Sequence, residues 1–361
     1  MTKLQTPLTS TLGSRHPIIQ TAMGWVATAD LVTASIEAGA FGFLAAAVMT
    51  PDECERSISQ IRSKSNEPFG VNFHSFQSGA NQIVDSCIEH NVTAISYSRA
   101  PSASIVKRVK ANGIKCVPTI GAAKHAKKAV DLGADVLVCQ GQEGGGHTGE
   151  TPTWLLLAQI LDMDLGLPIV ACGGFKDGRG LAAALTFGAD GIAMGTRFLL
   201  SNESPTPNQT KDAYLQANVT GIPVSTKLDG FPQRMVMNKR LAELEKAGAL
   251  TMLIQALTSA WRFKQEMGMP FLDVVRSAIA MASSSEATIG QTLMAANAPM
   301  IIQQSMVHGD PVAGVLPSGQ VAGIISDLPD CDALIKEIID DALACLDNAS
   351  KAKIEGGRHA V

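Results

Sequence analysis

Short apolar, β-branched runs alternate eight times with longer Ala-rich segments over the first 200 residues of this 361-residue chain. Such alternation is typical of parallel strands joined by crossover helices. We predict strands at residues 17–22, 41–45, 69–73, 93–97, 115–119, 135–140, 168–172 and 191–194. Eight successive units favour an α/β fold of the closed (β/α)8, or TIM barrel, type over an open doubly wound sheet.

The pattern changes after residue 200, where a polar segment with two prolines precedes helical periodicity. Helices are expected near residues 211–218, 238–247, 251–264, 271–281 and 291–298, with a last one over 331–349. The chain therefore divides into a barrel (1–203), a helical insertion forming a smaller substrate or lid domain (204–310), and a C-terminal return to the barrel with a tail (311–361).

The composition limits the kinds of molecule that the protein is expected to bind. The chain is 46% hydrophobic and 17% charged, with a net charge of -4. It has no basic stripe of the kind that binds nucleic acid, no apolar run of about 20 residues to cross a membrane, and no N-terminal signal core. We expect a cytoplasmic protein that acts on a small-molecule substrate, and we also consider a homodimer.

Seven cysteines without C-x-x-C spacing suggest reduced thiols. Cys116, Cys139 and Cys172 lie in strand-like runs and are expected to be core residues rather than nucleophiles. Ligand spacing typical of a metal site does not occur in the sequence, so no metal is expected.

A glycine loop at residues 140–150 follows the sixth predicted strand and carries His147. Glycines let backbone N–H groups approach a flat or anionic ligand, and Gly145 and Gly146 precede the imidazole directly. Histidine is the residue there that titrates near neutrality. The sequence therefore predicts a cofactor-binding loop in which His147 is the base. The alternative is that His147 only stabilises the loop.

Two more glycine loops follow the last two predicted strands. Gly173 and Gly174 come after the seventh, and Gly195, Thr196 and Arg197 come after the eighth. Barrels commonly bind phosphate there through backbone amides. We predict a phosphate site, with Arg197 supplying charge or a structural salt bridge.

Polar and apolar groups near the other strand ends complete the predicted site. Ala22, Met23 and Gly24 follow the first strand, where Met23 is placed to cover a ring system, unless it and Trp25 only plug the barrel. Asn72 and Gln140 are amides in apolar strands. Each needs a polar partner, either a bound heterocycle or another core group.

At these residues the sequence resembles the nitronate monooxygenase, or 2-nitropropane dioxygenase, family of FMN-dependent barrels. The matching segments are 17–24, 69–72, 140–149, 173–180 and 195–198, and 318–323 resembles the family's C-terminal return. The resemblance implies that Met23, Asn72, Gln140 and Gly145 contact the flavin. It also implies that Gly174, Gly195 and Thr196 hold the phosphate and that His147 is the catalytic base.

Two departures from the family pattern bear on function. Gly144 stands where many members carry alanine, a conservative change for the loop backbone. Segments 221–223, 227–232 and 294–299 look closest to members associated with bacterial steroid-ring breakdown through CoA thioesters. Lys227, Arg234, Lys239 and Arg240 are candidates to meet such an anionic substrate, or they form a solvated helix face.

Two enzymatic hypotheses follow from the resemblance. The first is an FMN oxidoreductase that oxidises alkyl nitronates with O2, using His147 as the base. The alternative is a flavin reductase of an enoyl-CoA, including steroid-derived CoA thioesters, or of a quinone. It would use NADH or NADPH as a transient reductant, since a Rossmann fingerprint is absent. A flavin-free phosphosugar barrel and a non-catalytic binding module are the remaining alternatives.

Overall fold

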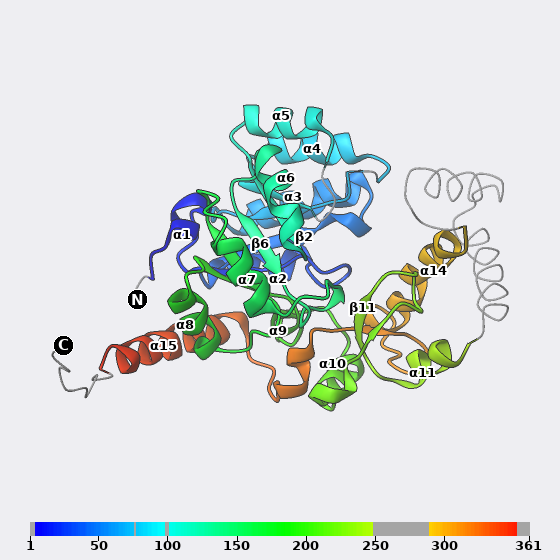
Figure 1. Ribbon diagram of the computed structural model, residues 1–361. Helices are drawn as coiled ribbons and strands as arrows, with labels where there is room; N and C mark the ends of the chain where they lie inside the picture. Colours follow the sequence, from blue (N-terminus) through cyan, green and yellow to red (C-terminus); the bar gives the residue numbers. More distant parts are fainter. Residues whose placement is uncertain (1–3, 76, 98–100, 248–288, 352–361) are drawn as a thin grey trace.

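Eight parallel strands close into a barrel in the computed structural model, which describes residues 4–75, 77–97, 101–247 and 289–351 (Figure 1). Around the barrel they follow the order β1-β2-β3-β4-β5-β6-β8-β9, and β9 pairs with β1. The strands are β1 (Ile18–Gln20), β2 (Phe41–Ala45), β3 (Gly70–Asn72), β4 (Ala94–Tyr97), β5 (Lys115–Ile120), β6 (Leu137–Gln140), β8 (Ile169–Cys172) and β9 (Gly191–Met194). The predicted TIM barrel is confirmed.

Helices on the outside of the barrel connect successive strands. They are α2 (Ala29–Glu37), α3 (Pro51–Lys64), α4 (Ala80–Glu89), α5 (Ala103–Ala111), α6 (Ala126–Asp131), α7 (Thr153–Leu161) and α8 (Gly178–Phe187), with 3-10 turns η1 (Ala46–Val48) and η2 (Ala123–His125). The last helix, α15 (Cys331–Ser350), packs on α8 and also contacts α2. It covers this side of the barrel (Figure 1).

The barrel interior is a packed apolar core. Side chains that alternate inward along the strands, such as Ile19, Phe43 and Val170, form one buried cluster. Gly70 leaves room for this packing, because a Cβ there would lie 2.2 Å from Cε1 of Phe43. Helix α1 (Pro7–Leu12) closes the N-terminal end of the barrel with side chains from the same cluster, including the fully buried Leu8.

The segment after the barrel differs from the purely helical insertion predicted above. The helices α9 (Thr196–Leu199), α10 (Asn208–Leu215), α11 (Lys239–Lys246) and α14 (Ile289–Met306) are present, with η3 (Val219–Gly221) and η4 (Gln320–Ile324). A small antiparallel sheet joins β10 (Val224–Ser225), β11 (Gln233–Val236) and β12 (Leu316–Pro317), and β7 (Gly146–His147) also pairs with β11. The helices predicted at 251–264 and 271–281 lie outside the described residues, and the domain boundaries stay predictions.

This sheet escaped prediction for a physical reason. β11 has the sequence Gln-Arg-Met-Val, two polar residues followed by two apolar ones, so it has no apolar-polar alternation by which to recognise it, and all four residues are buried. Of its three partners among the described strands, only β10 is close in sequence, whereas β7 and β12 lie 80 or more residues away on either side. Only the folded barrel brings them together.

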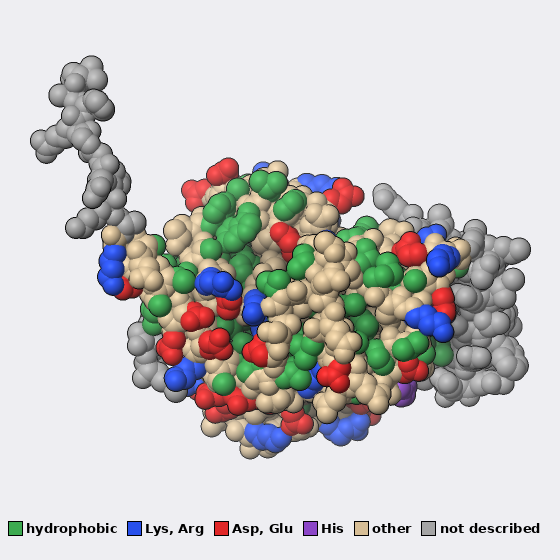
Figure 2. Space-filling model, turned by 90° about the horizontal axis from the view of Figure 1, so that it is seen from below, with side chains coloured by type: hydrophobic (Ala, Val, Ile, Leu, Met, Phe, Trp, Pro, Cys, Tyr) green, Lys and Arg blue, Asp and Glu red, His purple; other side chains and the backbone are tan. Residues whose placement is uncertain are grey.

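The positions of the strand cysteines and of the surface charges agree with the expectations from the sequence. Cys116, Cys139 and Cys172 are buried, and burial raises their pKa values to about 11, 12 and 12 respectively, which confirms them as core thiols. Acidic and basic side chains are interspersed on the face seen in Figure 2. Among the described helices, none combines the length and apolar character needed to cross a bilayer.

Candidate functional site

The C-terminal ends of the barrel strands form a polar layer above the apolar interior. Asn72 and Gln140 point inward there by strand alternation, as do Thr21, Ser96 and Thr119, and all but Ser96 are partly exposed. Polar side chains that reach partial exposure at the end of an apolar barrel mark the floor of a binding site rather than a closed core.

The loop that follows β6 is fastened to the scaffold at several points. Its Glu143 carboxylate accepts hydrogen bonds from the backbone N–H of Thr153, at 2.9 Å, and from the hydroxyl of Thr153, at 2.7 Å. Arg234 donates from Nε to the carbonyl of Gln142 at 2.9 Å. The start of α7 and strand β11 thus fix the backbone that carries the glycines.

His147 is held by the segment that follows the barrel. It lies in β7, opposite Gln233 of β11, and its side chain is 65% exposed. Its Nε2 donates to Oδ2 of Asp229 at 2.7 Å, and Asp229 is only 7% exposed. Gln233 donates to the same oxygen at 2.5 Å. An exposed imidazole oriented by a buried carboxylate suits proton transfer.

Asp229 remains a carboxylate although it is buried. Burial by itself raises its pKa, but hydrogen bonds from His147, the backbone N–H of Phe231 and Gln233, with the attraction of the imidazole, outweigh that effect. The net result is a pKa below the ordinary value for aspartate.

Gln140 and the glycines beside it form a tight group. The Gln140 amide donates to the carbonyl of His147 at 2.8 Å, and a Cβ on Gly144 would lie 2.7 Å from this amide nitrogen. Alanine at 144 would therefore require the Gln140 side chain to move. A Cβ on Gly145 would lie 2.5 Å from the backbone nitrogen of Gly319.

Asn72 takes up a different side of the barrel mouth, on β3. Its Nδ2 donates to the carbonyl of Ser96 at 3.1 Å and to the Ser96 hydroxyl at 2.9 Å. Within the described part of the chain, its Oδ1 accepts no hydrogen bond. Asn72 is therefore anchored by one end of its amide, and the other end is left as an acceptor for a ligand N–H group.

The second predicted phosphate loop lies against the return segment, and the first lies against the loop after β6. Gly173 and Gly174 have φ values of +105° and +85°, a region that favours glycine. The hydroxyl oxygen of Thr196 accepts from the backbone N–H of Gly319 at 2.8 Å, so its own proton can be donated to a ligand. A Cβ on Gly195 would lie 2.9 Å from the Thr21 hydroxyl and 3.3 Å from Sδ of Met23.

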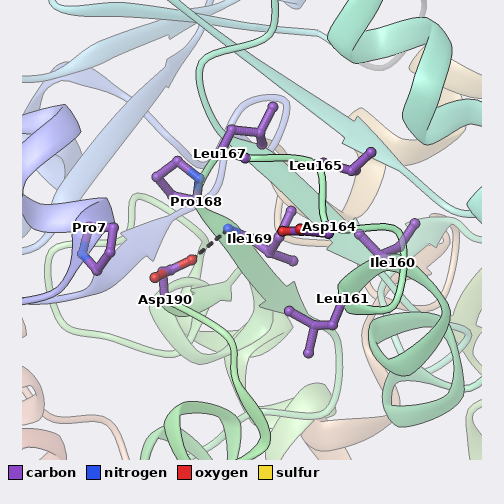
Figure 3. Close-up of a pocket in the computed structure, with 10 residues that line it drawn as sticks. Pro7, Ile160, Leu161, Asp164, Leu165, Leu167, Pro168, Ile169 and Asp190 are labelled. Atoms are coloured by element: carbon purple, nitrogen blue, oxygen red, sulfur yellow. Dashed lines mark hydrogen bonds between the residues drawn. The ribbon is translucent and has the colours of Figure 1, made fainter.

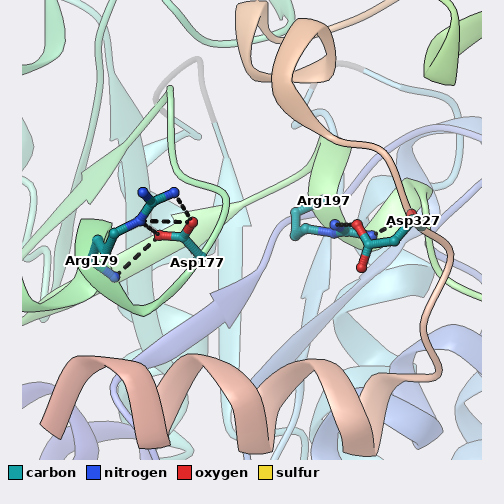
Figure 4. A network of polar contacts seen from close by, with 4 residues as sticks. All are labelled: Asp177, Arg179, Arg197 and Asp327. Atoms are coloured by element: carbon teal, nitrogen blue, oxygen red, sulfur yellow. Dashed lines mark hydrogen bonds and ion pairs between the residues drawn. The ribbon is translucent and has the colours of Figure 1, made fainter. Parts of the chain in front are cut away.

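Arg197 turns away from this site. It is 1% exposed and donates to Asp327 at 2.7 Å and to the carbonyl of Leu200 at 2.6 Å (Figure 4). Of the two roles open to it in the sequence, the structure therefore selects the structural salt bridge. The second pair in Figure 4, Arg179 with Asp177, lies at the start of α8.

The loop after β1 meets the last strand of the barrel. Ala22, Met23 and Gly24 follow β1, which pairs with β9, and of these three the Met23 side chain approaches Gly195 while Gly24 lies against Val48. Trp25, which follows, has a φ of +61°, uncommon outside glycine. A strained residue at the rim of the barrel is consistent with a loop shaped for a ligand.

The basic residues considered for an anionic substrate have mixed surroundings. Arg234 is 6% exposed and also donates to the carbonyl of Ile222 at 2.6 Å, so it is neither a substrate contact nor a solvated residue. Lys239 is exposed, and Arg240 lies 3.6 Å from Glu243. Across the described ranges, no three His, Cys, Asp or Glu side chains gather as they would around a metal ion.

A cavity of about 350 Å³ lies at the opposite end of the barrel (Figure 3). Its lining includes Pro7 of α1, Leu165, Leu167 and Asp190. The Asp190 carboxylate accepts from the backbone N–H of Ile169 at 2.8 Å. Because this end carries the strand starts, the cavity is separate from the glycine loops.

Sequence reasoning missed two residues of the site. Asp229 was noticed only as part of the 227–232 segment, and Gln233 was not singled out. An Asp-Gly pair normally signals a turn. Asp229 does accept from the backbone N–H of Phe231 at 3.0 Å, as in such a turn, but its other oxygen serves His147.

The barrel, its polar mouth and the histidine in the glycine loop define an oxidoreductase of the flavin-barrel class, and comparison with known proteins gives the family. The family model described as "Nitronate monooxygenase" matches residues 5–87 and 74–341. The chain belongs to the nitronate monooxygenase family, a family of flavin-dependent oxidoreductases.

Particular relatives differ in how much of the chain they match. A protein of Mycobacterium tuberculosis named "(3aS,4S,5R,7aS)-5-hydroxy-7a-methyl-1-oxo-octahydro-1H-indene-4-carboxyl-CoA dehydrogenase" is 45% identical, over 96% of this chain and 99% of its own. A Rhodococcus jostii protein of the same name is also 45% identical, over 96% and 98%. A "Probable nitronate monooxygenase" of Staphylococcus saprophyticus is 28% identical, over 68% and 82%.

Solved structures support the same fold. FabK from Thermotoga maritima has a TM-score of 0.76 and 26% identity, and the match covers 96% of this chain and 99% of FabK. Nitroalkane oxidase from Streptomyces ansochromogenes has a TM-score of 0.73 at 23% identity, covering 95% of this chain and all of that one, which supports the fold alone.

Proposed function

We propose that this protein is an FMN-dependent oxidoreductase that interconverts a CoA thioester of a ring-bearing carboxylic acid and its α,β-unsaturated form. The observation that carries the proposal is the 45% identity to two ring-carboxyl-CoA dehydrogenases over 96% of the chain. The match to the nitronate monooxygenase relative covers only 68%. Higher identity over nearly the whole chain therefore favours the thioester.

The residues at the barrel mouth suit FMN. Carboxamide groups at Asn72 and Gln140 can pair with the N–H and C=O groups of its ring, and the Met23 side chain can cover the ring. The N–H groups of Gly174 and Gly195 and the Thr196 hydroxyl would hold the phosphate, since both glycine positions favour close approach by a ligand. When bound, the flavin supplies hydride transfer.

His147 supplies the proton chemistry in this proposal. Thioesters acidify the neighbouring C–H, so a base can remove that proton as the adjacent carbon loses a hydride and a C=C bond forms. His147 would accept the proton, and the Asp229 carboxylate would stabilise the positive charge that the imidazole gains. The reverse reaction uses the same residue as the acid.

Nitronate oxidation with O2 is the second candidate function. The family model and the staphylococcal relatives favour it, and a histidine base beside a flavin is common to both reactions. The two candidates differ in the substrate that reduces the enzyme.

An anaerobic reduction experiment tests the proposal. The protein is loaded with FMN, and the flavin absorbance is followed after separate additions of a saturated bicyclic acyl-CoA, an alkyl nitronate, NADH and NADPH. Bleaching by the acyl-CoA, with an enoyl-CoA as product, supports the thioester function. Bleaching by the nitronate alone favours the second candidate, and rapid bleaching by a nicotinamide would place the enzyme in the reductive direction.

A further inference from the structure

The three hydrogen bonds to Asp229 determine where the proton of His147 lies. Oδ1 accepts from the backbone N–H of Phe231 at 3.0 Å, while Oδ2 accepts from Gln233 at 2.5 Å and faces His147 Nε2 at 2.7 Å. The Gln233 amide nitrogen also lies 3.2 Å from Nε2, but it makes its shorter hydrogen bond to Oδ2. A carboxylate can only accept, so the 2.7 Å contact places the proton of the neutral imidazole on Nε2. The lone pair of the ring is then on Nδ1.

We propose that Asp229 is a positioning residue that fixes the Nε2–H tautomer of His147, so that Nδ1 is the atom that takes the substrate proton. The chemical step rests on the function proposed above. The proton of the substrate carbon binds to the Nδ1 lone pair, and the electron pair of that C–H bond forms the C=C bond. The hydride that leaves the adjacent carbon would go to the flavin held at the barrel mouth. Asp229 itself gains no proton.

Two parts of the chain assemble this pair. His147 comes from the loop after β6, whereas Asp229 comes from the connection between β10 and β11, and the pairing of Gln233 with His147 sets their register. Gln233 is 3% exposed and donates to Asp229, so it restricts the carboxylate to one orientation. The base is therefore complete only when β11 docks on β7.

Replacing Asp229 by asparagine should reverse the tautomer. The backbone N–H of Phe231 cannot turn away and needs an acceptor, whereas the Gln233 amide can rotate to present its oxygen. The amide oxygen of Asp229→Asn therefore takes the place of Oδ1. The amide NH2 then replaces Oδ2 and donates to His147 Nε2. The imidazole proton moves to Nδ1, and the atom needed as the base is blocked.

Nitrogen NMR of the flavin-loaded enzyme, with 15N-labelled histidine, measures this tautomer without any substrate. The His147 signals are assigned by their loss in His147→Gln. We expect a protonated Nε2 in the wild-type protein and a protonated Nδ1 in Asp229→Asn. A protonated Nδ1 in the wild-type protein would overturn the proposal, and this measurement does not depend on the stability of the variant. The same tautomer in both proteins would also overturn it.

The kinetic test uses a matched control of equal charge. Asp340→Asn removes a carboxylate from the exposed face of α15, which lies apart from β11 (Figure 1). Asp229→Asn should lower kcat by about 10²–10⁴-fold with KM changed less than about threefold, while the control stays near wild type. Its activity should also recover at high pH, where hydroxide can replace the blocked base.

A purely structural role for Asp229 gives a different result. Flavin retention would fall together with activity, without reversal of the tautomer and without recovery at high pH, and the proposal would then be wrong. Failure of the thioester function is distinguishable, because the tautomer is measured without substrate. In that case the NMR result holds and only the acyl-CoA assay fails.

Discussion

At the residue scale, the neighbouring glycines 144 and 145 make different demands on the loop. A Cβ on Gly144 would meet the Gln140 side chain, which can rotate, whereas a Cβ on Gly145 would meet the backbone of Ser318 and Gly319, which cannot do so without moving the return segment. The identity of each neighbour, rather than the space alone, decides the effect of a methyl group.

We therefore expect Gly145→Ala to be the more damaging of the two substitutions. It should lower the free energy of unfolding by about 1–3 kcal/mol and weaken FMN binding, whereas Gly144→Ala should cost less than about 1 kcal/mol. Urea unfolding and fluorescence titration with FMN measure the two effects. Equal losses in both variants would show that Gln140 is as rigid as the backbone.

His147 offers a second prediction at this scale. His147→Ala should keep FMN bound and lower kcat by about 10²–10⁴-fold, since its ring is 65% exposed and contributes little to packing. The flavin spectrum and steady-state kinetics measure both quantities. Loss of flavin in parallel with activity would indicate that the histidine braces the loop instead.

Sequence patterns that are local along the chain predicted part of the site, whereas residues that meet only in the folded protein were missed. Glycines after strands and the lone imidazole are local signals, so His147 and the loops were visible in the sequence. Asp229 and Gln233 were not, because they meet His147 across more than 80 residues of chain. The burial of Arg197 was equally invisible, since its partner Asp327 lies 130 residues away.

At the element scale, α1 closes the barrel and was not predicted. Leu8 is fully buried, and the Cβ that Gly191 lacks would lie 2.5 Å from its side chain. Six residues are too few for helical periodicity to be recognised, whereas the barrel strands repeat eight times.

Leu8→Ala should therefore lower the free energy of unfolding by about 2–5 kcal/mol, the usual cost of a cavity in a packed core. Because α1 lies at the opposite end of the barrel from the glycine loops, FMN affinity should change less than about twofold. Urea denaturation and FMN titration test the two parts. A large loss of FMN affinity would contradict this expectation and would mean that the cavity at α1 alters the structure of the opposite end of the barrel.

The Arg197–Asp327 pair joins α9 to the segment that precedes α15. Asp327→Ala would leave a guanidinium that is 1% exposed without its carboxylate, although the carbonyl of Leu200 still accepts from it. Since Asp327 itself is 50% exposed, we expect a moderate loss of about 1–3 kcal/mol. Thermal unfolding against the exposed control Asp340→Asn checks this value.

At the scale of the whole molecule, the pH dependence of stability should carry a contribution from Asp229. Its folded pKa is depressed, so it stabilises the protein above the pKa of an unfolded aspartate, about 3.9, and this contribution disappears as pH falls through the folded value. The stability difference between wild type and Asp229→Asn should be largest near pH 7 and shrink below about pH 4. Urea unfolding across this range measures it, and a difference that grew in acid would contradict the pKa assignment.

Because the barrel supplies His147 and the segment after it supplies Asp229 and Gln233, chimeras between family members are limited in how they can combine these two parts. A chimera that keeps this barrel but takes the segment after it from another member would exchange Asp229 and Gln233 while retaining His147. Substrate preference and proton transfer would then change together. Transplants meant to alter only the substrate must keep residues 229–236 with the barrel, so specificity and catalysis are inherited here as one unit.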